Sequence, residues 1–214
     1  MLKIIRKNPF YYLLYALIFL IGLVLLASFP KTESVQWINN HWTPARDIFF
    51  RFYTYLGEGW VLVALCLILF FRNKWWGWMA LLSFALTTII SQLMKQVIYP
   101  NEARPFAVLK EVGLLHVVNG VEIHLTNSFP SGHTITAFSI ATLLAYHTKN
   151  KLISALLLVY AVGVAYSRMY LGQHFLVDTT FGSLIGVLTT MVSIYIVERV
   201  RDKKNKGKIL QAKS

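Results

Sequence analysis

Long apolar runs constrain this chain more than any other feature. The first covers residues 10–29, which is enough for a helix that spans about 30 Å of hydrocarbon at about 1.5 Å per residue. Five more runs follow, at residues 59–71, 75–98, 132–147, 152–166 and 177–197. The run at 59–71 is short for a span unless neighbouring residues extend it. The pattern predicts an all-α, polytopic membrane protein with six transmembrane helices.

Composition agrees with a bilayer location. The chain is 56% hydrophobic and only 14% charged, with a mean hydropathy of +0.54, whereas soluble domains carry about 25% charged residues. We predict one membrane-embedded domain over residues 1–214, with a basic flexible tail at about 201–214. The net charge of +12 would suggest nucleic-acid binding in a soluble protein. Here membrane topology explains the charge, and we expect membrane lipids but no nucleic acid as partners.

The distribution of basic residues predicts the orientation. In the six-span arrangement, 14 of the 21 Lys and Arg residues fall on the side that holds both termini. Basic residues stay preferentially on the cytoplasmic side, so both termini are predicted to be cytoplasmic in a multi-pass plasma-membrane protein. Segments 30–58 and 99–130 and the turn at 167–178 then face outward. Within the first of them, Thr43-Pro44 predicts either a short helix in the headgroup plane or an ordinary loop.

Polar residues gather at the outer ends of three predicted spans. Pro130-Ser131-Gly132-His133 begins the fourth span, so Ser131 and Gly132 would present free backbone N–H groups at a helix N-terminus. Such an end attracts phosphate, because unpaired amides and the helix dipole both favour an anion. A protonated His133 beside that anion could donate a proton to a leaving oxygen.

The turn before the last span carries a second group. His174 and Asp178 are four residues apart and share a face if this segment is helical. A carboxylate bound to one ring nitrogen would leave the other nitrogen free as a nucleophile. Arg168, six residues before His174, could bind phosphate through two N–H groups.

The third group lies at the outer end of the third span. Lys95 falls within the apolar run, and Pro100 is expected to end the helix so that Arg104-Pro105 lies in a loop. The two cations could neutralise phosphoryl oxygens. Each group has an ordinary structural explanation, as a turn, a hydrogen bond or a basic residue at a span end. Their convergence on one membrane face favours a functional site.

These residues resemble the type-2 phosphatidic acid phosphatase family. Its motifs are Lys-x6-Arg-Pro, Pro-Ser-Gly-His and Ser-Arg-x5-His-x3-Asp, and the second and third are complete here at residues 130–133 and 167–178. In the first motif, eight residues separate Lys95 from Arg104 instead of six. This difference puts the reach of Lys95 in question, and a local loop could restore it.

The resemblance implies a membrane lipid phosphatase whose active site lies at the outer membrane face and needs no metal or other cofactor. His174 would be the nucleophile of a phosphohistidine intermediate, Asp178 its orienting partner and His133 the acid. Lys95, Arg104, Ser131, Gly132 and Arg168 would hold the phosphate. Bacterial members of the family imply three substrates: phosphatidylglycerophosphate, phosphatidic acid and undecaprenyl pyrophosphate. The tasks implied are phospholipid synthesis and recycling of the cell-wall lipid carrier.

Three alternatives remain open at this stage. A zinc hydrolase could use His133, His174 and Asp178 as ligands, although the many cations argue against it. A transporter or flippase for anionic lipids would need the arginines but not the His174–Asp178 pair. A lipid phosphotransferase would use the same site with an alcohol as acceptor. The sequence does not indicate an oligomeric state or rank the lipid substrates.

Overall fold

The computed structural model describes residues 1–109 and 113–211, and this part of the chain is helical without strands. The all-α prediction is therefore confirmed for the described residues. The elements are α1 (Leu2–Ile5), α2 (Pro9–Ser28), α3 (Glu33–Asn40), α4 (Pro44–Tyr53), η1 (Thr54–Gly57), α5 (Gly59–Arg72), α6 (Lys74–Leu93), η2 (Met94–Ile98), α7 (Pro105–Leu109), α8 (Gly132–Tyr146), α9 (Lys151–Tyr170) and α10 (Leu176–Gln211).

Side-chain caps explain where several of these helices begin. Asn8 accepts a hydrogen bond from the Tyr11 amide at 3.1 Å, directly before the proline that opens α2. Asn73 and Asn150 cap α6 and α9 in the same way. An N-cap asparagine satisfies amides that have no partner within the helix, and proline fits the first helical position. Three of the apolar runs therefore become separate helices with a defined start.

Four helices are long and apolar enough to cross a membrane: Pro9–Ser28, Lys74–Ile98, Lys151–Tyr170 and Leu176–Gly207. A fifth candidate is the bent pair Pro44–Gly57 and Gly59–Arg72, whose axes differ by 51°. The predicted count of six is not reached by this measure, because α8 has only 15 residues. In the described part of the chain, length and composition thus support a multi-pass membrane protein with four or five spans.

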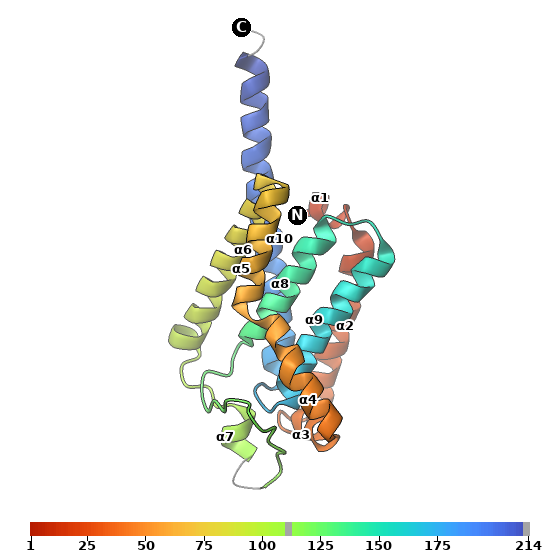
Figure 1. Cartoon of the computed structure of the whole chain (residues 1–214), viewed down its shortest axis with the longest axis vertical. Coiled ribbons are helices and arrows are strands. Elements are labelled where there is room, and N and C mark those ends of the chain that lie inside the picture. Colours follow the sequence, from red (N-terminus) through yellow and green to blue (C-terminus); the bar gives the residue numbers. More distant parts are fainter. Residues whose placement is uncertain (110–112, 212–214) are drawn as a thin grey trace.

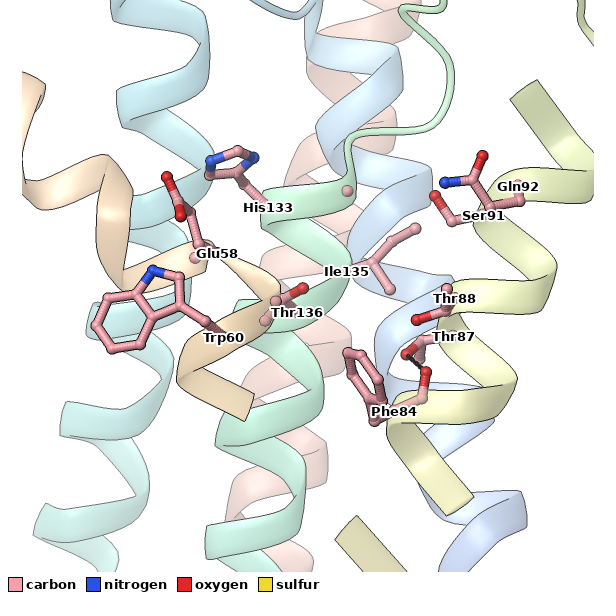
Figure 2. Close-up of a pocket in the computed structure, with 13 residues that line it drawn as sticks. Glu58, Trp60, Phe84, Thr87, Thr88, Ser91, Gln92, His133, Ile135 and Thr136 are labelled. Atoms are coloured by element: carbon pink, nitrogen blue, oxygen red, sulfur yellow. Dashed lines mark hydrogen bonds between the residues drawn. The ribbon is translucent and has the colours of Figure 1, made fainter. Parts of the chain in front are cut away.

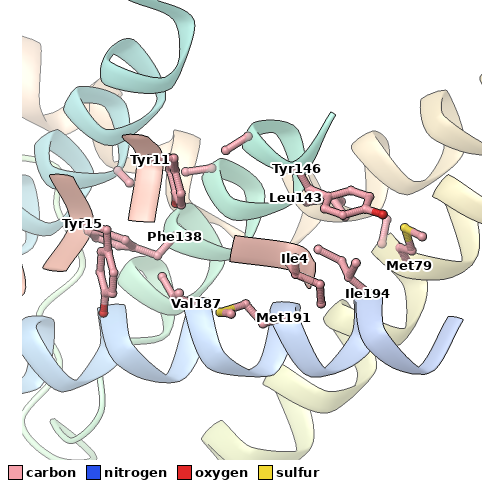
Figure 3. Packing of buried hydrophobic residues seen from close by; sticks show 14 of the residues in the cluster. Ile4, Tyr11, Tyr15, Met79, Phe138, Leu143, Tyr146, Val187, Met191 and Ile194 are labelled. Carbon is pink, nitrogen blue, oxygen red and sulfur yellow. The ribbon is translucent and has the colours of Figure 1, made fainter. Parts of the chain in front are cut away.

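Helix α8 lies at the centre of the bundle and packs against α9 and α10 (Figure 1). Its Phe138 meets Tyr15 of α2, with ring centroids 5.8 Å apart, and Val187, Met191 and Ile194 of α10 complete the core beside it (Figure 3). The burial on several sides explains why α8 can be short: it is surrounded by protein more than by lipid.

The two ends of the bundle differ. The N-terminus and the extended C-terminal part of α10 lie at one end, whereas α3, α4 and α7 lie at the other, beside the N-terminus of α8 (Figure 1). We call these the terminal end and the site end. The expected flexible tail at about 201–214 is helical as far as Gln211, and residues 212–214 lie outside the described part.

The segment after Thr43 forms a helix, as one of the two sequence interpretations predicted. The Thr43 hydroxyl caps α4 by accepting from the Arg46 amide at 3.2 Å. Ile48, Phe49 and Phe52 are exposed on this helix. An amphipathic helix with exposed aromatic residues suits an interface between protein and headgroups.

Candidate active site

The first and second sequence groups, at residues 130–133 and 168–178, meet through the backbone at the site end. The Ser131 amide donates to the Asp178 carbonyl at 3.1 Å, which joins the first turns of α8 and α10. The two helices can approach this closely because residue 182 is a glycine. A Cβ at Gly182 would lie 3.1 Å from the Ser131 carbonyl oxygen. The prediction that the Ser131 amide is free was therefore wrong, because this amide donates to the Asp178 carbonyl. The Ser131 hydroxyl also caps α8 at Thr134.

His174 and Asp178 form the predicted pair and are both buried. The His174 Nδ1 atom lies 3.4 Å from Asp178 Oδ2, a long hydrogen bond of the kind that tightens when a substrate is bound. The same oxygen accepts from the Ser128 hydroxyl at 2.5 Å and from the Phe175 amide at 2.9 Å. Three hydrogen bonds thus hold one oxygen of the Asp178 carboxylate. The Nε2 atom of His174 is the ring nitrogen that does not face this carboxylate.

Burial and neighbouring cations keep the His174 imidazole neutral. The pKa of His174 lies well below its ordinary value of 6.5, first because the ring is desolvated and then because Arg168, Arg104 and Lys95 lie near it. A neutral imidazole has a free lone pair at pH 7, which a nucleophile requires.

Arg168 lies on α9 with a side chain that is only partly satisfied. Its Nη1 donates to the Thr54 hydroxyl of η1 at 2.8 Å, and the residue is 6% exposed. The Nε atom is buried without a hydrogen-bond partner within the described residues. A buried guanidinium N–H without a partner is costly, so this donor is suited to an anion that enters the site.

The Arg104 guanidinium reaches the site, but most of its N–H groups donate to backbone carbonyls. It donates to the carbonyls of Thr126, Asn127 and Gln173 and to the Gln173 side chain, over 2.8 to 3.4 Å. Burial lowers the pKa of Arg104, whereas Asp178 opposes this change. Arg104 lies in a loop as predicted, whereas Pro105 begins α7. Arg104 also holds segment 126–127 against Gln173, the residue before His174.

Lys95 comes close to the other cations despite its longer spacing from Arg104. It lies in η2, a π-helical turn over Met94–Ile98, and Asn101 follows with a positive φ of 62°. A π turn and a left-handed residue both take up additional chain locally. Its charge interacts with those of Arg104, Arg168 and Asp178, and it has no hydrogen bond or ion pair within the described part.

His133 lies in the first turn of α8, where a cleft of about 290 Å³ opens between α5, α6 and α8 (Figure 2). Its charge environment consists of Arg168, His174, Lys95 and Arg104. The amides of Gly132 and His133 make no hydrogen bond in the described part of the chain, so they remain available at the helix N-terminus.

Four further residues contribute to this site, although the sequence analysis did not single them out. Ser128 binds Asp178, Gln173 binds Arg104, Thr54 binds Arg168, and Glu58 lines the cleft beside His133. Gln173 lies next to His174 and could have been suspected on that ground. The other three contacts join residues that are far apart in sequence, which no local pattern indicates.

The described residues contain no group of three or more His, Cys, Asp or Glu side chains that could hold a metal ion. The donors instead combine a buried neutral imidazole, a carboxylate behind it, three cations and free amides. This arrangement can bind a tetrahedral anion and present a nitrogen nucleophile to it.

The fold and the site therefore define a helical membrane protein with a cationic, histidine-bearing centre that is suited to an anion. The PAP2 superfamily model matches residues 76–202, which is more than half of the chain. The chain belongs to the PAP2 superfamily, and the resemblance stated from its motifs is confirmed.

Three relatives illustrate the range of this similarity. The chain is 32% identical to the bacitracin transport permease protein BcrC of Bacillus licheniformis, over 60% of this chain and 67% of the relative. It is 30% identical to phosphatidylglycerophosphatase B of Bacillus subtilis, over 63% and 67%. It is also 30% identical to an undecaprenyl-diphosphatase of Sulfolobus acidocaldarius, over 64% and 63%. The matches thus span about two thirds of each relative.

The fold is shared with a solved structure. The crystal structure of Aquifex aeolicus LpxE superposes with a TM-score of 0.69 at 33% identity, covering 79% of this chain and 98% of the other. The similarity therefore extends well beyond the motif residues to most of the helical bundle.

Proposed function

We propose that this membrane lipid phosphatase cleaves phosphate from lipid phosphates or pyrophosphates through a phosphohistidine at His174. The observation that carries the proposal is the buried His174–Asp178 pair, joined to the N-terminus of α8 and surrounded by Lys95, Arg104 and Arg168. His174, His133 and Asp178 are the catalytic residues in this account.

The phosphate is bound by groups that lack protein partners. The Gly132 amide, the Arg168 Nε atom and the Lys95 ammonium group each have a donor available, and the Ser131 hydroxyl retains its proton for donation. Arg104 contributes positive charge and its remaining N–H. Such donors stabilise the equatorial oxygens as charge redistributes in the transition state.

In the first step, the Nε2 atom of His174 attacks phosphorus and forms a P–N bond while the bond from phosphorus to the lipid oxygen breaks. The protonated His133 donates its proton to that oxygen, and the lipid alcohol or lipid monophosphate leaves. Asp178 accepts the Nδ1–H of His174 and stabilises the positive charge that develops on the ring.

In the second step, water attacks the phosphohistidine. His133, now neutral, accepts a proton from the water, the P–N bond breaks, and inorganic phosphate leaves. Both histidines return to their starting protonation states. No step is assigned to a metal, so full activity in a chelator is a prediction of this mechanism.

The lipid portion of the substrate lies on the His133 side of the phosphate, because His133 serves the leaving oxygen. The cleft at His133 has apolar walls from Trp60, Phe84 and Ile135, and a polar edge from Thr88 and Gln92 of α6 (Figure 2). These walls suit a lipid chain close to its headgroup. Phosphatidylglycerophosphate, phosphatidic acid and undecaprenyl pyrophosphate all fit this requirement.

We further propose one domain with six membrane-crossing helices: α2, α5, α6, α8, α9 and α10. An even number fits the position of α1 and of the C-terminal part of α10, which lie at the same end of the bundle (Figure 1). Basic residues concentrate at that end, so we place it in the cytoplasm and the site at the extracytoplasmic face.

Phosphate release by purified protein tests the proposal. Wild type and His174→Ala are compared in detergent with EDTA, on undecaprenyl pyrophosphate and phosphatidylglycerophosphate. We expect release by the wild type and a loss of several orders of magnitude in the variant. Equal release by both proteins would exclude His174 as the nucleophile, and dependence on added metal would exclude the metal-free mechanism. Phosphate found on an added alcohol would indicate a phosphotransferase.

A further inference from the structure

A turn outside the three sequence groups forms one wall of the site. The turn η1 is fixed by Thr54, whose hydroxyl accepts from Arg168, and by the Leu56 carbonyl, which accepts from the Tyr160 hydroxyl at 2.8 Å. Gly57 packs directly on α8: a Cβ at this position would lie 2.9 Å from the His133 carbonyl oxygen and 3.0 Å from the His133 Cβ. The residue that follows Gly57 is therefore held at a fixed place beside His133.

That residue is Glu58, and its carboxylate makes no contact that stabilises the fold in the described part of the chain. Glu58 occupies the N-cap position of α5, but its side chain does not cap the helix. It makes no hydrogen bond or ion pair there. Instead Glu58 lines the same cleft as His133, and Figure 2 shows both side chains at that end of the cleft. Its charge also interacts with the buried Arg168 guanidinium.

The charges around His133 are unfavourable for its protonated form. A general acid must carry a proton, and the groups that face His133 from the neighbouring elements are mostly cationic: Arg168 of α9, Lys95 of η2 and Arg104, with neutral His174. These cations repel a protonated imidazole. Asp178 already accepts three hydrogen bonds at His174, whereas Glu58 interacts with Arg168, the cation that acts most strongly on His133.

We propose that Glu58 is a positioning residue for His133, which it orients and stabilises in the protonated form that serves the lipid leaving group. This inference rests on the proposed phosphohistidine mechanism, in which His133 is the acid. Glu58 does not touch the phosphate. It acts on P–O cleavage only through His133, and its contribution depends on how strongly the leaving oxygen needs a proton.

A pair of substrates tests this dependence. Dioctanoyl phosphatidic acid releases an alkyl oxygen that must be protonated, whereas p-nitrophenyl phosphate releases a phenolate that departs without a proton. We expect Glu58→Gln to lower kcat/KM about 10-fold on the lipid and less than about 2-fold on the aryl ester. His133→Ala should show the same contrast more strongly. Glu33→Gln, which removes an exposed acid of α3 at the site end, should leave both values unchanged.

The outcomes separate the two proposals. Equal losses for Glu58→Gln on both substrates, or no loss on either, while His133→Ala shows the contrast, would overturn the role of Glu58 alone. Equal losses for His133→Ala on both substrates would overturn His133 as the acid and thus the proposed mechanism.

Glu58→Asp keeps the charge, so recovery of at least half of the lost lipid activity supports the inference over a folding defect. The basic limb of the kcat/KM profile on the lipid should also move to lower pH in Glu58→Gln.

Discussion

Asp178 is the residue on which the site depends most, because one carboxylate oxygen receives Ser128, Phe175 and His174. A carboxylate that is fixed by two short hydrogen bonds can hold the imidazole in one tautomer. That constraint leaves the other ring nitrogen, Nε2, as the nucleophile. The quality of the nucleophile therefore depends on a serine that is 50 residues away in the sequence.

At the residue scale, we expect Ser128→Ala to lower kcat by about 10- to 100-fold, because a hydrogen bond to a charged group contributes about 1.5–3 kcal/mol. Ser128→Thr keeps a hydroxyl and should recover part of the activity. Hydrolysis of phosphatidic acid at saturating substrate measures the effect, with Ser34→Ala as a control at the same end of the bundle. Full activity of Ser128→Ala would show that this hydrogen bond does not position Asp178.

The sequence predicted the residues of this centre but not their support. Histidine, aspartate and arginine at fixed spacing were visible along the chain, and the structure brings His133, His174, Asp178, Arg104 and Arg168 together. Ser128 and Glu58 were not visible, since their roles depend on contacts between segments that only the folded chain brings together. Their functions, like those of the motif residues, stay predictions until variants are measured.

At the element scale, the turn η1 and the start of α8 form one packed unit. Gly57 permits this contact, since a Cβ there would also lie 2.5 Å from Val164 Cγ1 of α9. The π turn η2 performs a similar task for Lys95 by taking up part of the longer first motif. Local deviations from regular helix thus position two walls of the site.

We expect Gly57→Ala to destabilise the protein by about 1–3 kcal/mol and to lower activity, because the methyl group has no space beside His133 and Val164. Gly59→Ala is the matched comparison for stability. Its Cβ would meet only Phe84, at an ordinary 3.7 Å. Thermal unfolding in detergent measures both variants, and equal melting temperatures would contradict the packing described for η1.

At the scale of the whole molecule, helix class and multi-pass character followed from the apolar runs alone, and helices occur at all six runs. The number of membrane crossings did not follow as directly. Helix α8 is short because it lies inside the bundle, where protein surrounds it. Apolar length predicts a span against lipid, but it cannot separate a short central span from a buried helix.

The stability of the whole molecule should depend on pH, because the buried His174 and the half-buried His147 are both uncharged in the folded protein. Burial, with Lys7 nearby, lowers the pKa of His147 at the terminal end to about 4, and that of His174 lies well below 6.5. The unfolded chain binds these protons at about pH 6.5, before the folded protein does. Stability should therefore be complete above about pH 6.5 and fall as the pH decreases toward 4.

Melting temperatures in detergent between pH 7.5 and 4.5 test this sign. His147→Gln removes one titrating group, so its melting temperature should depend less on pH than that of the wild type. An unchanged pH dependence in His147→Gln would show that this histidine does not contribute to the loss of stability.

Rapid-quench trapping of the phosphoenzyme tests the central claim most directly. Wild-type protein is mixed with radiolabelled lipid phosphate, stopped in alkali within milliseconds and digested for peptide mapping. The account predicts an acid-labile, alkali-stable label on the peptide that contains His174, and no label in His174→Ala. Hydrolysis at the wild-type rate without any label on this peptide, or label on another residue, would contradict it.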